Sequence, residues 1–153
     1  MDIKNLKQNI KANKNKIAHD IENRSKNLEK RWRKFEKDFF SQMEEIAKTK
    51  WKHENYKVYL LYSCFWGGDY DLNKPSIYIN PLLKYGDSLY VIFHELSHSI
   101  YWEYIYSKYS FKFIKKNYNF LWQISEVMVN YPLLKLKINY KFPLIIPPNL
   151  KIF

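Results

Sequence analysis

Apolar side chains follow two different spacings along the chain, and each spacing predicts a different kind of element. In the first third they recur at steps of three and four, which forms one stripe on a helix. The clearest stripe is Leu28, Trp32, Phe35, Phe39, Met43 and Ile46, and a weaker one is Ile3, Leu6, Ile10, Ile17 and Ile21. We expect helix over much of residues 3–50, broken or frayed near residues 13–16.

The pattern changes at Tyr56, where β-formers become frequent. The segments from Tyr56 to Tyr62 and from Ser76 to Asn80 are rich in β-branched and aromatic residues. Gly67-Gly68-Asp69 and Asn73-Lys74-Pro75 lie between them and are typical of turns. We therefore predict two strands joined by an irregular loop.

Helical spacing returns after this region. Gly86-Asp87-Ser88 offers a helix N-cap, and a helix is expected from Leu89 to about Ser107. A second helix is expected to begin near Asn117 or Asn119 and to end at Pro132. The prolines of the last segment predict an extended tail over residues 133–153. The fold class is therefore α+β, with a helical segment (1–52), a core (56–132) and a tail.

Composition narrows the class of protein. The 153 residues suit one domain, and aromatic residues make up 19% of the chain, enough for a packed core. A single cysteine, Cys64, excludes an internal disulfide framework. The N-terminus lacks a signal peptide pattern, and no run is long enough to span a membrane. We expect a soluble, cytoplasmic, single-domain protein.

The net charge of the chain favours negatively charged binding partners. Lys and Arg total 26 and Asp and Glu total 15, which gives +11. Nucleic acid, an anionic membrane surface or an acidic protein are the partners that such a charge favours. The lysines near the N-terminus are interspersed with asparagines, and Arg, which usually leads in phosphate and base recognition, occurs at Arg24, Arg31 and Arg33 alone. Nucleic-acid binding is therefore the weakest of the functional hypotheses.

The sharpest chemical signal is the run His94-Glu95-Leu96-Ser97-His98. Two histidines four positions apart lie one above the other on a helix, so both imidazoles can reach one metal ion. Glu95 is placed to accept a proton from water at the same ion. The motif predicts His94 and His98 as metal ligands and Glu95 as general base and acid.

Helix geometry separates these residues from the apolar face. His98 lies about 40° and Glu95 about 100° around the helix from His94. The apolar residues of the same helix lie at roughly 160° to 260°. They are Leu89, Ile92, Phe93, Leu96 and Ile100. Histidines with a purely structural role would more often lie within the apolar arc, so this arrangement favours a metal site.

A catalytic zinc takes three protein ligands and keeps one position open. No histidine follows His98, and the acids that follow the motif are Glu103 and Glu126. Glu103 lies about 180° from His94 and points away from the metal face. Glu126 lies in a mostly apolar helix, where a carboxylate is costly unless it is paired or ligated. Glu126 is therefore the predicted third ligand. The alternatives are a salt bridge from Glu126 to Lys115, Lys116 or a basic residue of the N-terminal helix, and a ligand role for His19 or His53.

Two histidines and a glutamate suit zinc better than magnesium or calcium. Zinc polarises a carbonyl group and lowers the pKa of water to about 7. The expected cofactor is one Zn²⁺ per chain. The implied reaction is hydrolysis of an amide bond in a peptide or protein substrate.

These features resemble the gluzincins, zinc metallopeptidases with a His-Glu-x-x-His helix and a glutamate ligand on a later helix. The short length and the strand–helix–helix order are similar to the minigluzincins, soluble minimal versions of the catalytic units of integral-membrane metallopeptidases. The resemblance covers about residues 56–132. It implies a zincin-like fold with a small, mostly antiparallel sheet, an active-site helix and a helix that carries the glutamate ligand.

The resemblance also implies roles for further residues. Many gluzincins place an aspartate, bonded to a histidine ligand, at the position that corresponds to Asn130. An amide can accept that bond but lacks the charge that raises ligand basicity. Tyr131 is the preferred candidate for stabilising the transition state. The edge strand that binds substrate corresponds to Ile77, Tyr78, Ile79 and Asn80.

Minigluzincins resemble zymogens in which a C-terminal segment occupies the cleft, which implies an autoinhibitory role for residues 133–153. Packing of this tail elsewhere on the domain is the alternative. Cys64 is expected to be a buried small hydrophobe, with a fourth-ligand role in a latent form as the alternative. A catalytically silent metal-binding scaffold and a basic nucleic-acid-binding protein are the competing functions, and the oligomeric state stays open.

Overall fold

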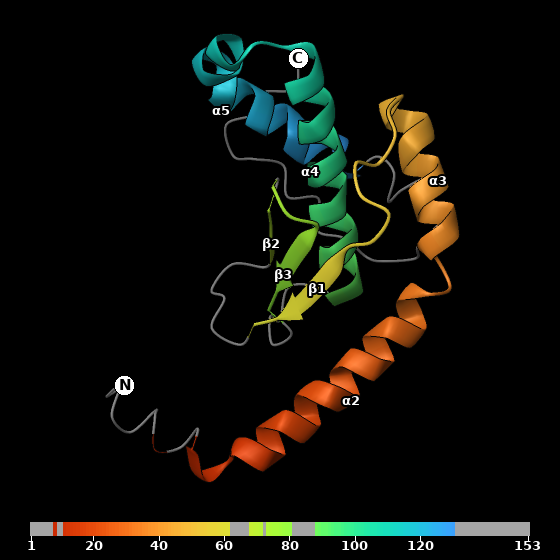
Figure 1. Ribbon diagram of the computed structural model, residues 1–153, viewed down its shortest axis with the longest axis vertical. Coiled ribbons are helices and arrows are strands. Elements are labelled where there is room, and N and C mark those ends of the chain that lie inside the picture. The colour runs from red at the N-terminus through yellow and green to blue at the C-terminus, as the bar shows by residue number, and fades with distance from the viewer. Residues whose placement is uncertain (1–7, 9–10, 62–67, 72, 81–87, 131–153) are drawn as a thin grey trace.

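The computed structural model describes residues 8, 11–61, 68–71, 73–80 and 88–130. Its helices are α2 (Lys14–Trp32), α3 (Glu36–Ala47), α4 (Ser88–Lys108) and α5 (Phe111–Met128). Its strands are β1 (Lys57–Leu60), β2 (Gly68–Asp71) and β3 (Ser76–Ile79). The protein is therefore α+β, as the sequence predicts, with α4 packed against a small sheet and the other helices in contact with α4 (Figure 1).

The N-terminal region forms two helices. A turn at Asn13 precedes α2, where the sequence predicts a break, but a second interruption at residues 33–35 was not expected. There the main-chain N–H of Phe35 donates to the carbonyl of Trp32 at 2.8 Å. The bend lets Trp32 pack against both α3 and α4, with ring centroids 5.8 Å from Phe39 and 5.2 Å from Phe93. Aromatic packing at the bend therefore outweighs the continuous helical pattern of the sequence.

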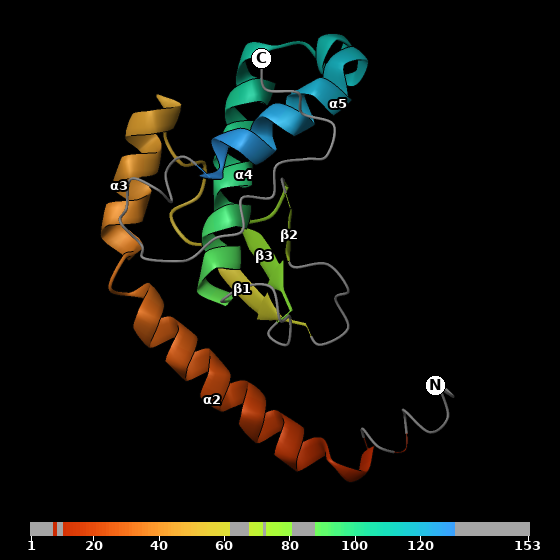
Figure 2. The ribbon, with the colours of Figure 1, turned by 180° about the vertical axis from the view of Figure 1, so that it is seen from behind.

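Helix α2 is an arm. None of its residues is buried, and in both views it runs away from the other elements, with its C-terminal end nearest to them (Figures 1 and 2). Pairs of oppositely charged side chains four positions apart lie on its exposed surface, including Arg24 with Asp20 and Lys26 with Glu22. Such exposed pairs support the helix only weakly, because water and salt screen their charges.

The strands form a mixed sheet in the order β1-β3-β2. Strand β1 pairs parallel with β3, and β2 pairs antiparallel with β3. The predicted mostly antiparallel sheet is therefore wrong for the described strands. The predicted edge strand at residues 77–80 is also wrong, because β3 is central. Strand β2 arises from the segment that the sequence predicts to be loop, and it takes the edge beside α4.

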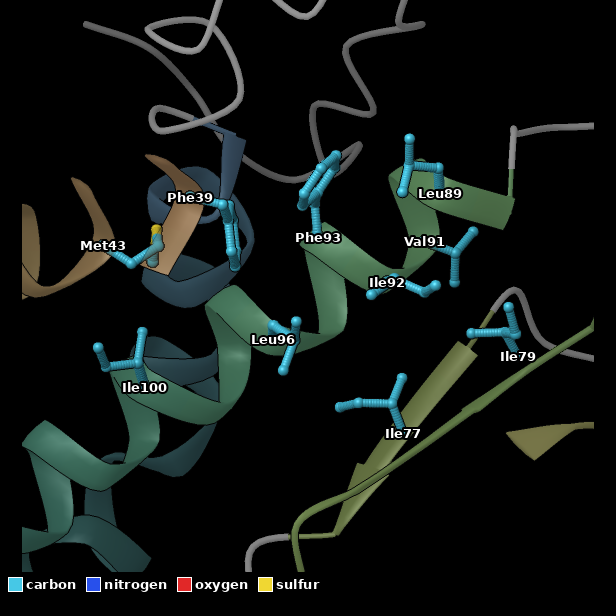
Figure 3. Packing of buried hydrophobic residues seen from close by; sticks show 10 residues of the cluster. All are labelled: Phe39, Met43, Ile77, Ile79, Leu89, Val91, Ile92, Phe93, Leu96 and Ile100. Atoms are coloured by element: carbon cyan, nitrogen blue, oxygen red, sulfur yellow. The ribbon is translucent and has the colours of Figure 1, made fainter. Parts of the chain in front are cut away.

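Helix α4 lies at the centre of the molecule, at its predicted position. The isoleucines of β3 pack against one side of it, and α3 packs against another, as Figure 3 shows. Twelve of its residues are buried, so α4 is covered on more sides than a simple amphipathic helix. The main core consists of Phe39, Met43, Ile77, Ile79, Leu89, Val91, Ile92, Phe93, Leu96 and Ile100.

Helix α5 begins earlier than the sequence predicts. Ser110 caps its N-terminus, and its hydroxyl accepts the main-chain N–H of Phe113 at 3.3 Å. The helix thus starts at Phe111 rather than near Asn117, because the serine cap outweighs the asparagines as a start signal. Its buried residues Ile114 and Leu121 pack with Trp102 and Ile105 of α4.

Some predictions concern residues outside the described part of the chain. They are the roles of Cys64 and Tyr131 and the autoinhibitory tail at residues 133–153. Among the described helices, none is long and apolar enough to cross a membrane.

Candidate metal centre

The structure brings the three predicted ligands together. His94 and His98 lie one turn apart on α4, and Glu126 reaches them from the C-terminal part of α5. One ligand atom from each residue lies within 4.8 Å of the other two. Among the described residues, this group could hold a metal ion, and neither His19 nor His53 belongs to it.

The spacing of the ligand atoms fits tetrahedral coordination. Two atoms that each lie about 2.1 Å from an ion, at the tetrahedral angle, are about 3.4 Å apart. The Nε2 atoms of His94 and His98 are 3.0 Å apart. Oxygens of Glu126 lie 3.6 Å from Nε2 of His94 and 3.3 Å from Nε2 of His98. The three separations bracket the tetrahedral value, so the residues fit a small divalent ion such as zinc.

His94 is prepared to act as a neutral ligand. Burial lowers the pKa of His94 to about 4, the neighbouring His98 acts in the same direction, and Glu126 opposes both. At neutral pH the His94 imidazole therefore keeps a lone pair for a metal. The Nδ1 atoms of His94 and His98 are buried without a hydrogen-bond partner among the described residues. Their ring orientation is thus set by packing rather than by a carboxylate behind them.

Glu126 faces the histidines rather than Lys115 or Lys116. Burial alone would raise the pKa of Glu126, but hydrogen bonding and charge from His98, together with His94, bring it below the ordinary value of a glutamate. A carboxylate that is ionised at neutral pH is the form that binds zinc. The salt bridge to lysine, considered as an alternative from the sequence, is therefore not what the structure shows.

Glu95 belongs to α4, and its side chain lies against Gly68 of β2. The residue is 8% exposed. Burial raises the pKa of Glu95 to about 8, and the nearby carboxylates of Asp69 and Glu126 add to the effect. A glutamate with such a pKa can hold or release a proton near neutral pH. Glu103, by contrast, lies on α4 away from the ligands and accepts the main-chain N–H of Lys52 at 3.3 Å.

Strand β2 approaches α4 closely because it carries a glycine at this point. A Cβ atom at Gly68 would lie 2.5 Å from Cγ1 of Val91 and 2.8 Å from both Cγ and Oε1 of Glu95. Any side chain here would push β2 away from the helix or displace Glu95. The Gly-Gly pair that predicts a turn in the sequence is therefore used for packing at its second position.

Tyr70 of β2 is a site residue that the sequence does not reveal. Its ring stacks on that of His98, with centroids 5.8 Å apart and planes at 13°. Burial, followed by the charge of Glu95, raises the pKa of the Tyr70 phenol well above its ordinary value. The hydroxyl therefore remains a donor at all working pH values. Finding it from sequence would have required the pairing of β2 with β3.

Asn130 does not contact the histidines as the resemblance implies. Its Oδ1 accepts a hydrogen bond from the Tyr90 hydroxyl at 3.2 Å, and its Nδ2 donates to the carbonyl of Glu126 at 2.7 Å. Tyr90 in turn lies beside His94, with ring centroids 5.7 Å apart. Asn130 thus supports the centre indirectly, by tying the end of α5 to the first turn of α4.

Comparisons with known proteins add no relative. Models of protein families, curated proteins and solved structures were compared with the chain, and none of them matches it. The chemistry of the centre must therefore be argued from its own residues.

Proposed function

We propose that the protein is a zinc-dependent peptidase of the gluzincin type. The observation that carries the proposal is the convergence of His94, His98 and Glu126 at tetrahedral spacing. Glu95, which follows His94 directly in the chain, is buried, and burial raises its pKa to about 8. A zinc hydrolase needs at least three protein ligands and a neighbouring acid–base group.

Zinc in this centre would polarise the carbonyl of a peptide bond and lower the pKa of water to about 7. The chain supplies the ligands and the proton transfer. Glu95 accepts the proton of the attacking water and later donates it to the leaving nitrogen, so its carboxylate is restored when the peptide bond is broken. A pKa near the working pH suits both halves of this transfer.

Two hydroxyl groups flank the centre and are candidates to donate to the substrate. Tyr70 packs on His98, and Tyr90 lies beside His94. Burial raises the pKa of Tyr90 to about 12, so this phenol also stays protonated. The Tyr90 hydroxyl already donates to Asn130, which makes Tyr70 the better candidate to stabilise charge that develops on the substrate carbonyl.

A peptide substrate would add to the sheet at β2, because β2 rather than β3 is the edge strand beside the centre. The main-chain N–H of Tyr70 donates to the side chain of Asp69 at 2.9 Å, so a side chain satisfies this donor. A peptide that pairs with β2 would exchange this local bond for one to its own carbonyl. Asp69→Asn weakens the acceptor and is expected to lower KM.

Cleavage of an unfolded, casein-like substrate by zinc-loaded protein tests the proposal. Cleavage should disappear with a chelator and in Glu95→Gln, which should retain zinc. Glu103→Gln, on the same helix but away from the ligands, is the matched control and should remain active. Zinc binding without cleavage in both the wild type and Glu103→Gln would support the silent metal-binding scaffold instead.

The proposed latency has its own test in the same assay. Residues 133–153 carry the prediction of an autoinhibitory tail, so a chain that ends after Pro132 is expected to cleave faster than the full chain. Equal rates for the two chains, at equal zinc content, would contradict autoinhibition without affecting the proposed metal centre.

A further inference from the structure

The turn between α4 and α5 exposes aromatic rings to solvent. Every residue from Tyr106 to Phe113 is exposed. Among them, Phe111 is 73% exposed and Tyr106, Tyr109 and Phe113 are 43–45% exposed. We call these four rings the aromatic tip. So many large apolar side chains at one end of a molecule are unusual for a surface that faces only water, and they typically mark a contact surface.

Tyr109, Phe111 and Phe113 of the aromatic tip do not belong to the core of the domain, whereas the Tyr106 ring packs on Trp102 with centroids 6.0 Å apart. Tyr109 and Phe113 stack on one another with ring centroids 4.8 Å apart, on the outside of the turn. The inner side of the turn is filled by Ile105 and Ile114, which pack with Trp102 and Leu121. The inner residues therefore already hold α4 and α5 together, and the outer rings are available to another surface.

Lysines surround the aromatic tip, and acids are absent from this stretch. Between Tyr104 and Ser125 the sequence contains no Asp or Glu. It contains Lys108, Lys112, Lys115 and Lys116, all of them exposed. Nζ of Lys108 lies 5.8 Å from the ring centroid of Tyr104. This end of the molecule is therefore both apolar and positively charged, which fits a partner that is apolar inside and negative at its surface.

A bilayer that contains anionic lipids has these two properties. Tyr and Phe rings settle at the level of the headgroups, and lysines keep their charge in water while their stems lie along apolar surface. The aromatic tip lies at the end of two packed helices that protrude beyond the sheet (Figure 1). A protruding end fits a soft, flat surface, whereas single-stranded nucleic acid is generally held in a groove.

We propose that the aromatic tip docks the protein on the surface of an anionic membrane. Phe111 and Phe113 enter the headgroup region, and the neighbouring lysines bind the anionic lipids. The metal centre would then lie about 12 Å along α4 from the membrane-facing turn, from the separation of His98 and Tyr106. The docking is interfacial and does not depend on the proposed hydrolysis.

Sedimentation of the full chain with vesicles tests this proposal. The vesicles contain phosphatidylcholine alone, or phosphatidylcholine with about 30% phosphatidylserine, at about 0.15 M salt. Binding should require phosphatidylserine. Phe111→Ser/Phe113→Ser should weaken it about tenfold or more. Phe120→Ser, which removes a ring that is 62% exposed on α5 outside the tip, should leave it within about twofold.

Lysine variants test the proposal independently if urea unfolding shows that Phe111→Ser/Phe113→Ser is unstable. Each lysine near an anionic surface contributes about fivefold to binding, so Lys112→Gln/Lys116→Gln should weaken it about 25-fold. Lys14→Gln/Lys16→Gln removes the same charge from α2 and should weaken binding by about threefold or less.

Three results would overturn the proposal. The first is absence of binding to the phosphatidylserine vesicles. The second is equal loss of binding in the tip variants and in their matched controls. The third is binding of a single-stranded oligonucleotide, or a dimer that dissociates in Phe111→Ser/Phe113→Ser, while vesicles are not bound.

Discussion

The close approach of β2 to α4 makes Gly68→Ala a direct test of how the centre is built. The added Cβ would lie 2.5 Å from Cγ1 of Val91 and 2.8 Å from Cγ and Oε1 of Glu95. Cβ atoms in proteins essentially never lie within 3.0 Å of a non-bonded heavy atom, so β2 or the helix side chains must move. Overpacking of this kind costs about 1–3 kcal/mol of unfolding free energy.

The perturbation can be assigned to its contact by a double-mutant cycle. Val91→Ala removes Cγ1, the atom nearest to the added methyl group, and leaves the contact with Glu95 in place. In the double variant, the cost of Gly68→Ala should therefore fall by at least about 0.5 kcal/mol. Lys57→Ala, at an exposed position on β1, is a control that should change stability by about 0.5 kcal/mol or less.

Urea unfolding followed by tryptophan fluorescence provides the measurement, since the chain contains 5 Trp. The m value should stay constant, so that the shift in midpoint reports stability alone. A Gly68→Ala protein that unfolds at the same urea concentration as the wild type would refute the close packing of β2 on Glu95. A cost that is the same with valine and with alanine at position 91 would contradict the contact between the added methyl group and Cγ1 of Val91.

Three further predictions concern the core, the pH dependence and the flanking phenol. Phe39 is fully buried among aromatic rings, so Phe39→Ala should lower the unfolding free energy by about 3–5 kcal/mol in urea, whereas Phe111→Ala at its exposed site should have little effect. In metal-free protein, burial raises the pKa of Glu95 from 4.5 to about 8, so the folded state keeps a proton that the unfolded state loses. Stability should fall by about 2 kcal/mol from about pH 6.5 to pH 8, and an equal fall in Glu95→Gln would contradict this assignment. Tyr70→Phe should retain zinc and lower kcat about 100-fold or more, and an unchanged kcat would exclude the hydroxyl from the reaction.

The main helices follow from local chemistry, which is why the sequence predicts them. The periodic apolar residues around His94 place α4 correctly, and the wheel places both histidines on one face. The break at residues 33–35 depends on contacts between Trp32 and rings that are distant in sequence. Periodicity carries no information about such contacts, so the two helices are predicted as one.

The candidate site likewise combines features that the local sequence predicts with features that depend on distant contacts. The grouping of the candidate ligands is predicted because histidines are rare and lie at a characteristic spacing, and elimination among few acids is enough to select Glu126. The surroundings depend on strand pairing, which a short turn-like segment does not reveal. Gly68 and Tyr70 therefore enter the site through β2, and Asn130 bonds to Tyr90 rather than to a histidine.

The proposed function depends on one zinc ion held by His94, His98 and Glu126 together. Its most direct test is the metal content of the purified protein by mass spectrometry, with Glu126→Ala as the decisive variant and Glu103→Gln as a control acid on α4. We expect about one zinc per chain in the wild type and in the control, and a loss of zinc in Glu126→Ala. Zinc that is retained in Glu126→Ala, or a wild-type protein that binds none when zinc is supplied, would contradict it.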